Sequence, residues 1–509
     1  MVSLIQPANA LAGKAQYQRH QPERTLLYQL VEQHYPPFRF LMARTERPLP
    51  DFVQQAFDAF LKCGRLEHGF LRVQCQSCKH EDLVAFSCKK RGFCPSCGAK
   101  RMVEHAALLV DEILPEVPYR QWVLSVPFQL RFLFASKPNV MSKALGIVYR
   151  TIAMYLIHAA GHTHETATTG AITFIQRFGS ALNLNVHFHM LFLDGVYVSL
   201  KSGKLSFKPV NAPTKDQLQA VVQRISERLA KLLTRQGLLT QEDDSSYLTI
   251  DALDDNALHH LQSHSVTYRV AIGPQQGKKV FTLRTIPAQE PEDGRFSQVG
   301  KVDGFSLHAA VATQAHERKK LERICRYIAR PAVAEPRLSL TKSGNARYEL
   351  KTPYRDGTTH VIFEPLDFMA RLAALVPKPR VNLTRYHGVF APNSAHRAQI
   401  TPSQRGRGSK QNTGTSTLML DDKSFIEKRA AMTWAQRLKR VFNIEIEVCR
   451  HCQGQVKIIA CIEDPAVIER ILACLYSKSD VATIQTGGPL LPMPRAPPAK
   501  SEWLWPDIE

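Results

Sequence analysis

The sequence predicts an α+β protein with a cysteine-rich module near its N-terminus and a small unit near its C-terminus. Three observations support this fold class. Segments with the two-residue period of a strand alternate with segments of helical period between residues 115 and 400. Ten of the eleven cysteines fall into two clusters, one on each side of that region. Residues 401–416 contain almost no apolar side chains, so they cannot offset their ordering entropy by burial and are typical of a linker.

Helical segments precede and follow the first cysteine cluster. Asp51–Lys62 has apolar residues at helical spacing, beginning with Phe52 and Phe57, and belongs to a lead-in. Met102–Leu114 predicts a second helix, which stops before Pro115. We divide the chain into a helical lead-in (1–60), a cysteine-rich module (61–114), a central α+β domain (115–400), a linker (401–418), a C-terminal unit (419–486) and a Pro-rich tail (487–509).

The central domain mixes strands and helices. β-branched and aromatic residues predict strands at Gln121–Phe128, Ala171–Phe178 and Leu182–Val198. Helical periodicity predicts helices at Met141–Ala160 and Lys215–Arg235. In the C-terminal unit a further helix is expected at Lys423–Phe442, ahead of the second cysteine cluster.

Charge and hydropathy limit the partners and the location of the protein. Lys and Arg number 66 against 45 Asp and Glu, and the formal net charge of +21 favours a polyanionic partner. No uninterrupted apolar run approaches the roughly 20 residues that span a bilayer. The first residues lack the basic segment and apolar stretch of a signal peptide. We therefore expect a cytoplasmic protein with no membrane partner, whose clustered cysteines bind metal rather than form disulfides.

The first cysteine cluster has the spacing of a zinc site. Cys75 and Cys78 form one CxxC pair, and Cys94 and Cys97 form a second pair after fifteen intervening residues. Each pair supplies two thiolates to a tetrahedral ion, so we expect one structural Zn²⁺ held by these four residues. Unliganded thiols are the alternative, but so many would build a poor core. Four neighbours could replace a ligand or form part of a second site: Cys63, His68, His80 and Cys88.

The second cysteine cluster gives a weaker metal signal. Cys449 and Cys452 form a CxxC pair that His451, Cys461 or Cys474 could complete, but no second CxxC pair follows. Structural thiols are therefore the favoured interpretation here, and a metal site is the alternative.

The first cluster is also strongly basic. Between Lys62 and Arg101, nine basic residues stand against three acidic ones, which predicts a contact with the phosphate backbone of nucleic acid. A solvated basic face on a purely structural module is the alternative, because surface charge alone has little specificity. The candidates for the phosphate contact in this segment are Lys89, Lys90, Arg91 and Arg101.

Two histidines lie on one face of the strand expected over Leu182–Val198. The even positions of its first half are all apolar, whereas the odd positions run through Asn183, Asn185, His187 and His189. A buried polar patch needs hydrogen bonds or a metal to offset its desolvation, and imidazoles two residues apart converge on one cation. We expect His187 and His189 to bind a metal; two hydrogen-bonded core histidines are the alternative.

A basic helix is expected over His316–Ala329, because helical composition continues to the residues before Pro331. Tyr327 lies at the edge of the apolar face of this helix, among Arg323, Arg326 and Arg330. Its phenol can therefore meet a phosphate that guanidinium groups hold. A packed amphipathic side chain is the alternative interpretation of this tyrosine.

Four segments carry these features together: GSALNLNVHFHMLFLDGVY, FSCKKRGFCPSCGAKRM, CRYIARP and RYHGVFAPNSAHR. In combination they resemble the motifs of the rolling-circle transposases of the insertion sequence 91 family and its common-region relatives, which are HUH (His-hydrophobic-His) single-strand nucleases. The resemblance covers most of residues 60–400. It implies an N-terminal zinc-binding domain that binds DNA, and a catalytic domain built on an HUH-type antiparallel sheet between helices.

The resemblance also implies roles for individual residues. His187 and His189 match the metal-binding pair, and Tyr327 matches the nucleophilic tyrosine. Members of the two-tyrosine type carry another tyrosine four residues earlier, where this chain has Arg323. The chain is therefore similar to the single-tyrosine common-region branch. Tyr386 is the rival nucleophile, although its Pro-flanked segment is more typical of a structural turn.

The implied activity is that of a transposase that cleaves and rejoins single-stranded DNA at element ends and in target DNA, through a 5′-phosphotyrosine intermediate. Mg²⁺ or Mn²⁺ would be held by the two histidines and a third ligand, and a homo-oligomer is left open. Asn183, Asn185, His162 and His164 are the candidates for the third ligand. The alternatives are a plasmid replication initiator or relaxase, a non-catalytic zinc protein that binds nucleic acid, and a zinc-dependent hydrolase, which lacks an evident glutamate base.

Overall fold

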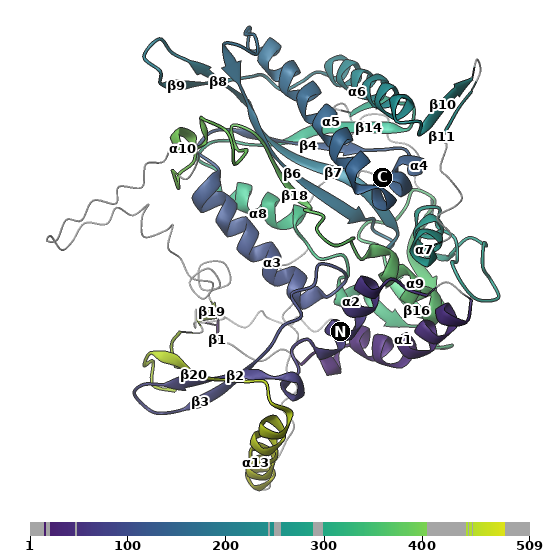
Figure 1. Ribbon diagram of the computed structural model, residues 1–509, viewed down its shortest axis with the longest axis vertical. Helices are drawn as coiled ribbons and strands as arrows, with labels where there is room; N and C mark the ends of the chain where they lie inside the picture. Colours follow the sequence, from purple (N-terminus) through teal and green to yellow (C-terminus); the bar gives the residue numbers. More distant parts are fainter. Residues whose placement is uncertain are drawn as a thin grey trace, which may run out of the picture. The chain divides into compact units, whose positions relative to one another are not determined.

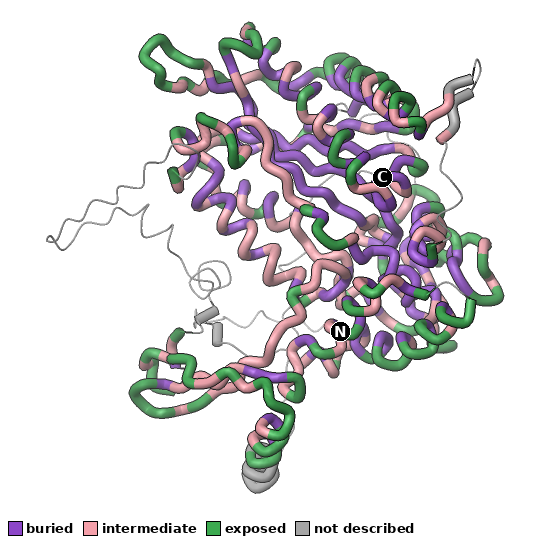
Figure 2. Tube along the Cα trace, in the orientation of Figure 1, coloured by how far each residue is buried: buried purple, intermediate pink, exposed green. Residues whose placement is uncertain are grey.

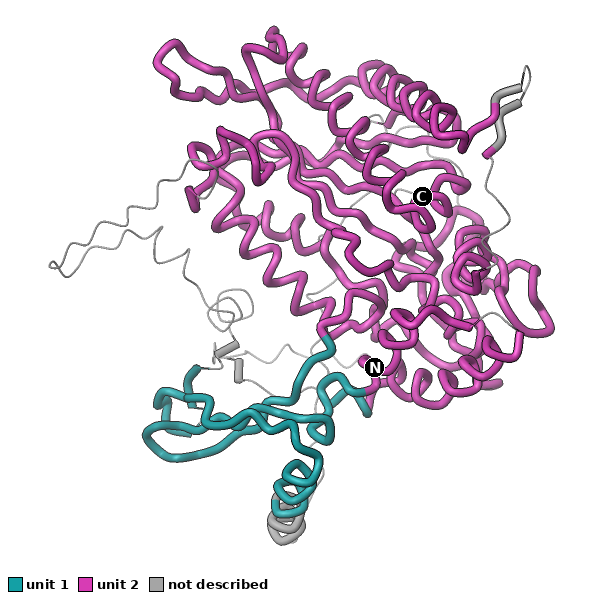
Figure 3. The backbone as a smooth tube through the Cα atoms, viewed as in Figure 1, with its two compact units in different colours: residues 1–23, 62–88, 423–492 teal, residues 24–61, 89–422, 493–509 magenta. Residues whose placement is uncertain are grey.

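The computed structural model describes residues 15–16, 21–45, 48–242, 245–248, 256–288, 299–404, 444–445, 447–449 and 451–483. The chain divides into two compact units (Figure 3). The larger unit consists of residues 24–61, 89–422 and 493–509, and the smaller unit of residues 1–23, 62–88 and 423–492. The smaller unit therefore combines segments that are far apart in the sequence.

A six-stranded antiparallel sheet lies at the centre of the larger unit (Figure 1). Its order is β13-β14-β4-β7-β6-β18, so β7 is an inner strand between β4 and β6. The strands are β4 (Tyr119–Ser125), β6 (Gly170–Phe178), β7 (Leu184–Leu193), β13 (Val299–Val302), β14 (Phe305–Thr313) and β18 (Thr384–Gly388). The predicted α+β class, with an antiparallel sheet between helices, is confirmed.

Three helices cover one face of this sheet: α4 (Phe128–Ser136), α5 (Pro138–Ala159) and α6 (Lys215–Arg235). The even positions of β7, Val186 and Phe188 among them, pack with these helices in the main hydrophobic core. A capping box of Thr214 and Gln217 starts α6. α5 is long and apolar enough to cross a membrane, but most of its apolar stretch is buried inside the protein, as in a core helix.

Two helices cover the opposite face: α3 (Pro95–Leu108) and α8 (Arg318–Ile328). Leu191 and Leu193, at odd positions of β7, pack with Leu321 and Ile324 of α8 in a second core. A π-helical turn at Leu109–Ile113 extends α3. Figure 2 shows the strands of the sheet as a buried layer between the two sets of helices.

Shorter elements complete the larger unit. A four-stranded antiparallel sheet has the order β12-β17-β16-β15, a three-stranded sheet has the order β5-β8-β9, and β10 pairs with β11. The strands are β5 (Ala167–Thr168), β8 (Gly195–Ser199), β9 (Leu205–Pro209), β10 (Leu239–Glu242), β11 (Ser245–Leu248), β12 (Phe281–Arg284), β15 (Leu338–Leu340), β16 (Ala346–Glu349) and β17 (Thr358–Phe363). The helices are α1 (Leu26–Arg44), α2 (Asp51–Lys62), α7 (Ala257–Val266), α9 (Pro365–Leu375) and α10 (Arg397–Ile400).

The smaller unit is built around a three-stranded sheet of order β20-β2-β3. Its elements are β2 (Phe70–Cys75), β3 (Glu81–Ala85), β20 (Val456–Ile462) and α13 (Pro465–Thr483). Phe70 of β2 packs with Ile468 and Leu472 of α13 in a small core. Residues 456–483, which belong to the expected C-terminal unit, therefore fold onto the hairpin of the cysteine-rich module.

Several sequence expectations can be compared with the described elements. The helices expected at residues 51–62 and 215–235 coincide with α2 and α6. The helix expected at residues 102–114 begins earlier, at Pro95, because proline suits the first helical position. The long strand expected at residues 182–198 divides into β7 and β8. The helix expected at Lys423–Phe442, residues 405–418 of the linker and the tail 487–509 lie outside the described residues.

Candidate active site and cysteine centres

β7 places both histidines on the face of the sheet that α3 and α8 cover. His187 and His189 are 8% and 6% exposed, and their ring centroids lie 4.9 Å apart. Asn183 and Asn185, at the preceding odd positions, are buried as well. The predicted alternation of polar and apolar faces is therefore confirmed, and the two imidazoles lie next to each other in the interior.

Hydrogen bonds orient both imidazole rings through their Nδ1 atoms. Nδ1 of His187 lies 2.9 Å from the carbonyl oxygen of Asn185, so this nitrogen donates its proton there. Nε2 of the Gln121 side-chain amide on β4 lies 2.8 Å from Nδ1 of His189, so the amide N–H donates to Nδ1 and the ring proton is on Nε2. The amide oxygen of Gln121 is buried without a hydrogen-bond partner among the described residues. With the amide turned over, that oxygen accepts the Nδ1 proton, and Nε2 of His189 then has a lone pair for a cation, as Nε2 of His187 already has.

Burial keeps the two rings neutral. Desolvation lowers the pKa of His187 to about 4, and it lowers the pKa of His189 well below its ordinary value. The neutral imidazole is the form that binds metal, because its second nitrogen carries a lone pair. The pair is therefore available to a divalent cation at neutral pH.

α8 positions Tyr327 beside the histidines. Leu321, Ile324 and Ile328 bury one face of this helix against the second core, and the Tyr327 ring packs at the edge of that core. The ring centroid of Tyr327 lies 6.4 Å from that of His189. The structure thus brings Tyr327 next to the two histidines of β7, which precede it by 140 and 138 positions in the sequence.

Two cations surround the Tyr327 phenol. The ammonium of Lys351 donates a hydrogen bond of 3.3 Å to the phenol oxygen, and the guanidinium of Arg330 lies over the ring, 4.3 Å from its centroid. Burial on its own raises the pKa of Tyr327, but the charges and hydrogen bonds of Arg330 and Lys351 outweigh that effect, and the pKa falls below its ordinary value. The surroundings therefore favour the phenolate.

Gln176 offers a further oxygen donor beside the histidines. Within the described residues no third His, Cys, Asp or Glu joins His187 and His189 within ligand distance. Gln176 of β6 is paired directly opposite His187. Its Nε2 donates to the carbonyl oxygen of Ile328 over 2.6 Å, and its buried Oε1 has no hydrogen-bond partner among the described residues. Gln176 therefore links β6, the strand paired with β7, to the end of α8, and its side-chain oxygen stays available to a cation.

The four residues that the sequence offered as third ligands lie in two different places. Asn183 and Asn185 are buried on the histidine face, and each has a side-chain oxygen without a hydrogen-bond partner in the described structure. His162 contacts Thr166 in the turn after α5, and His164 is exposed in the same turn. The asparagines thus share the buried face with the histidines, whereas His162 and His164 belong to the surface turn.

The basic residues around α3 have different surroundings. Lys89 is exposed and Lys90 is half-buried. Arg91 donates to the carbonyl oxygen of Val381 over 2.5 Å, and Arg101 donates to the carbonyl oxygens of Lys89 and Lys90 over 3.1 and 3.3 Å. Arg91 and Arg101 therefore hold the backbone near α3 in place, and the contact of this group with DNA stays a prediction.

Three basic residues of α8 are exposed or half-buried near Tyr327 in the sequence. Lys319 and Arg323 are exposed, and Arg326 is half-buried, on the same helix as Tyr327. Tyr386, the rival nucleophile, lies on β18 with its ring against the second core and beneath the guanidinium of Arg397, 5.4 Å from the ring centroid. Burial raises the pKa of Tyr386. Its surroundings therefore favour the neutral phenol, unlike those of Tyr327.

The cysteines form two groups that differ from the expected one. Cys63, Cys88, Cys94 and Cys97 form one group, and Cys75, Cys78, Cys449 and Cys452 form the other. In each group the sulfur atoms all lie within 4.8 Å of one another. The expectation that Cys75, Cys78, Cys94 and Cys97 share one ion is therefore wrong in its pairing. The reason is that spacing along the chain does not record which distant segments meet.

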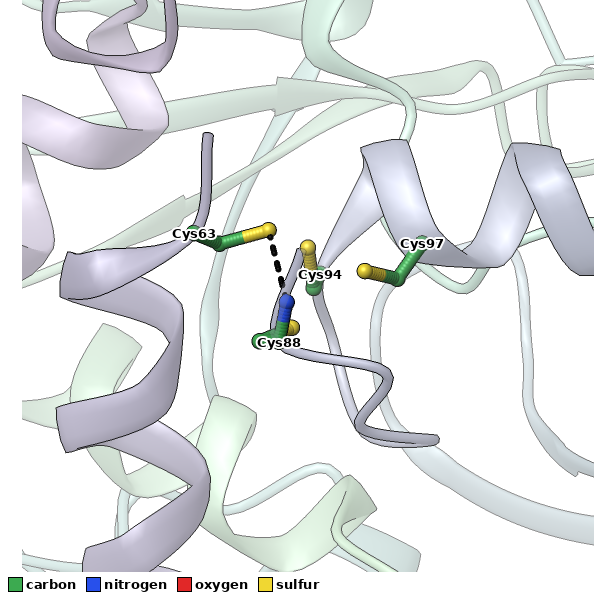
Figure 4. A group of neighbouring side chains, drawn as sticks. All are labelled: Cys63, Cys88, Cys94 and Cys97. Atoms are coloured by element: carbon green, nitrogen blue, oxygen red, sulfur yellow. Dashed lines mark hydrogen bonds between the residues drawn. The ribbon is translucent and has the colours of Figure 1, made fainter. Parts of the chain in front are cut away.

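Figure 4 shows the first group, in which the sulfur atoms point toward a common centre. Cys63 follows α2, Cys88 precedes the loop to α3, and Cys94 and Cys97 stand at the N-terminal end of α3. The amide of Cys88 donates to Sγ of Cys63 over 3.3 Å. Cys63 and Cys88, which the sequence indicated as substitute ligands, thus complete the set, whereas His68 and His80 belong to neither group.

Sequence analysis missed three residues of the histidine–tyrosine site. Gln121 and Gln176 are buried polar residues in strands rich in large apolar side chains, and that contrast is a signal that could have identified them. Lys351 follows β16, which belongs to a different sheet from β7, and no local pattern marks it. The sequence alone could thus have indicated the two glutamines as site residues, but it could not have indicated the lysine.

Two family models match the chain. One, described as a transposase zinc-binding domain and named for insertion sequence 91, matches residues 30–126. The other, described as a putative transposase, matches residues 170–398. The first range contains Cys63 to Cys97, and the second contains His187, His189 and Tyr327. No curated protein and no solved structure matches the chain.

Proposed function

Because the chain belongs to the family of insertion sequence 91 transposases, we propose that it cleaves and rejoins single-stranded DNA at the ends of a rolling-circle element. A transposase breaks and joins DNA strands, so DNA is its partner. The proposal of a tyrosine mechanism rests on one observation. Tyr327 lies beside the His187–His189 pair, with 6.4 Å between the ring centroids of Tyr327 and His189. Action on DNA also fits the cytoplasmic location expected from the sequence.

Tyr327 is the nucleophile of the proposed reaction. Its phenolate oxygen attacks the scissile phosphorus, the bond from phosphorus to the 3′ oxygen breaks, and that oxygen takes up a proton to leave a free 3′-hydroxyl. The new bond is a 5′-phosphotyrosine, which keeps the energy of the phosphodiester. A later 3′-hydroxyl can reverse the attack, so cleavage and joining need no external energy source.

Arg330 and Lys351 support this step electrostatically. Both lie against the Tyr327 phenol and lower its pKa, which increases the population of the attacking phenolate at neutral pH. Arg323 and Arg326 precede Tyr327 on the same helix, where guanidinium groups can hold the phosphate oxygens as charge moves onto them. The helix thus supplies both the nucleophile and part of the phosphate-binding surface.

The donor set beside Tyr327 fits a divalent cation of the HUH type. Nε2 of His187 has a lone pair to offer, Nε2 of His189 has one when the Gln121 amide is turned over, and Gln176 has a buried amide oxygen without a partner among the described residues. Two imidazoles and an amide oxygen suit Mn²⁺ or Mg²⁺ with further positions left for substrate. When bound, such an ion polarises the scissile phosphate. We propose Gln176 as the third protein ligand.

Structural Zn²⁺ supports the fold outside this site. The zinc-binding family model and the grouped cysteines both indicate it. The first group, at the start of α3, is entirely within the range of that model. A closed set of four thiolates leaves no position for substrate, so this ion is structural and not catalytic.

The decisive experiment compares two tyrosine variants. Purified full-length protein is incubated with labelled single-stranded oligonucleotides from the flanks of its own gene, with Mg²⁺ or Mn²⁺, and covalent adducts are separated on a denaturing gel. Tyr327→Phe removes only the hydroxyl, so it is expected to keep DNA binding but form no adduct. Tyr386→Phe is the matched control and is expected to form the adduct like the wild type.

The same assay separates the proposal from its alternatives. Cleavage by Tyr327→Phe at the wild-type rate would refute the tyrosine mechanism and favour attack by water. Binding without cleavage by any variant, the wild type included, would favour a non-catalytic nucleic-acid-binding protein. Cleavage of a plasmid origin but not of the flanking oligonucleotides would favour a replication initiator or relaxase.

A further inference from the structure

The two CxxC segments of the smaller unit form turns with the same backbone geometry. In the first turn the amide of Cys75 donates to the carbonyl of His80 over 2.8 Å, and the amide of Lys79 donates to the carbonyl of Cys75 over 3.1 Å. In the second turn the amide of Cys449 donates to the carbonyl of Gly454 over 2.8 Å, and that of Gln453 to the carbonyl of Cys449 over 3.0 Å. The two turns thus repeat the same hydrogen bonds at the same offsets.

The residue after each CxxC pair also has the same unusual conformation. Lys79 has a φ of 63° and Gln453 a φ of 62°, both in the left-handed region that few side chains adopt. A left-handed residue at this point turns the chain sharply back, which leaves both thiols of a pair on the inside of the turn. Two segments with unrelated neighbours share this costly feature, which indicates a common structural purpose.

The four sulfur atoms lie at distances that suit one tetrahedral ion. Sγ of Cys75 is 3.4 Å from Sγ of Cys452, and Sγ of Cys78 is 3.5 Å from Sγ of Cys449. Thiolates about 2.3 Å from a tetrahedral Zn²⁺ are about 3.8 Å apart. A disulfide requires about 2.05 Å between its sulfur atoms. The observed distances therefore fit a metal and are too long for disulfides.

The surrounding backbone fixes the two turns against each other. β20 pairs with β2 so that Val456 is the partner of Cys75, and the amide of Gln76 donates to the carbonyl of Gln455 over 2.9 Å. A Cβ atom on Gly454 would lie 2.5 Å from Oγ of Ser77 and 3.0 Å from Sγ of Cys75. The turns approach each other so closely that a larger residue than glycine would displace the Ser77 side chain and press against the sulfur of Cys75.

We propose that Cys75, Cys78, Cys449 and Cys452 bind a second structural Zn²⁺, separate from the ion of the first cysteine group. This ion fastens the strand β20 and the helix α13 to the hairpin of β2 and β3. The zinc-binding family model ends at residue 126 and does not contain Cys449 or Cys452. The zinc-binding part of this protein is thus bipartite, and its C-terminal ligands complete a site that its N-terminal ligands begin.

A zinc count on the full-length protein tests this proposal independently of DNA cleavage. The wild type is expected to hold two Zn²⁺ per chain, and Cys449→Ser combined with Cys452→Ser is expected to hold one. Cys461→Ser combined with Cys474→Ser is the matched control, because both cysteines are exposed and belong to neither group. The control is expected to keep two ions. Two ions in the Cys449 and Cys452 variant, or one in the wild type, would overturn the proposal.

Alkylation of the wild-type protein tests the same proposal without the Cys449 and Cys452 variant, so it still applies if that variant does not fold. With zinc bound, Cys449 and Cys452 are expected to resist a thiol reagent although Cys452 is exposed, whereas Cys461 reacts. A chelator is expected to expose Cys75, Cys78, Cys449 and Cys452 together, as mapped by mass spectrometry. Reaction of Cys452 at the rate of Cys461 before chelation contradicts the proposal. So does a disulfide that persists until a reductant is added.

Discussion

Lys351 offers a direct test of how the site activates Tyr327. Its ammonium is a hydrogen-bond donor to the phenol and lies 4.7 Å from the ring centroid. Lys351→Met keeps the length of the side chain but removes the charge. The pKa of Tyr327 is then expected to rise, because one of the two cations that lower it is gone. Fewer chains carry the phenolate at neutral pH, and cleavage slows.

The size of the effect follows from the separation of the two atoms. Lys351 Nζ lies 3.3 Å from the phenol oxygen. At that distance two unit charges interact by about 1.3 kcal/mol with the dielectric constant of water and by about 5 kcal/mol at an effective value of 20. Both side chains are half-buried, so solvent screening favours the lower part of this range. About 1.4 kcal/mol corresponds to a roughly tenfold loss of cleavage rate.

Single-turnover cleavage measured across a pH series is the assay. For Lys351→Met the rate is expected to be about tenfold lower at neutral pH and to approach the wild-type rate as the pH rises, because the phenol then ionises without assistance. Lys351→Arg keeps the charge and serves as the control, with a profile close to that of the wild type. A Lys351→Met profile that coincides with the wild type at every pH would refute this account of activation.

Three other outcomes are expected. His187→Ala combined with His189→Ala should abolish divalent-dependent cleavage yet retain binding in a gel-shift assay, because dispersed basic residues contact phosphate; normal cleavage would contradict the metal assignment. Cys94→Ser combined with Cys97→Ser should lower zinc content and the melting temperature and weaken end-specific binding, since metal binding supplies folding energy; an unchanged melting curve would argue against this. Mass spectrometry of a suicide-substrate adduct should find one DNA-linked peptide, containing Tyr327, and a second adduct would contradict the single-tyrosine prediction.

Local patterns predicted the parts of the structure that depend on neighbouring residues. The alternation in β7 identified which side chains share a face, since the strand period is independent of the rest of the chain. The apolar spacing of α6 identified that helix from end to end. His187 and His189 were found in the same way, because two polar residues in a buried strand contradict their surroundings.

The sequence did not predict which distant segments of the chain contact each other. Cys75 has the same spacing to Cys78 as Cys94 has to Cys97, and nothing in one sequence tells which pairs meet. The partner of Cys75 is instead Cys452, which lies 377 positions away and is brought close by the pairing of β2 with β20. Lys351 contacts Tyr327 from the segment after β16, a strand of a second sheet, and local patterns do not predict that contact either. Such information resides in tertiary packing and not in local periodicity.

The pairing of β2 with β20 also has a consequence for the growing chain on the ribosome. β3 is translated soon after β2, but β20 follows after more than 370 residues, as the 377 positions between Cys75 and Cys452 indicate. At roughly 5–20 residues per second, β2 waits on the order of 20–75 s for this neighbour. Its second edge meanwhile presents unpaired amides and carbonyls, which can pair with another nascent chain. Products of premature termination before residue 456 are therefore expected to aggregate through this edge, whereas a finished chain closes it with its own strand.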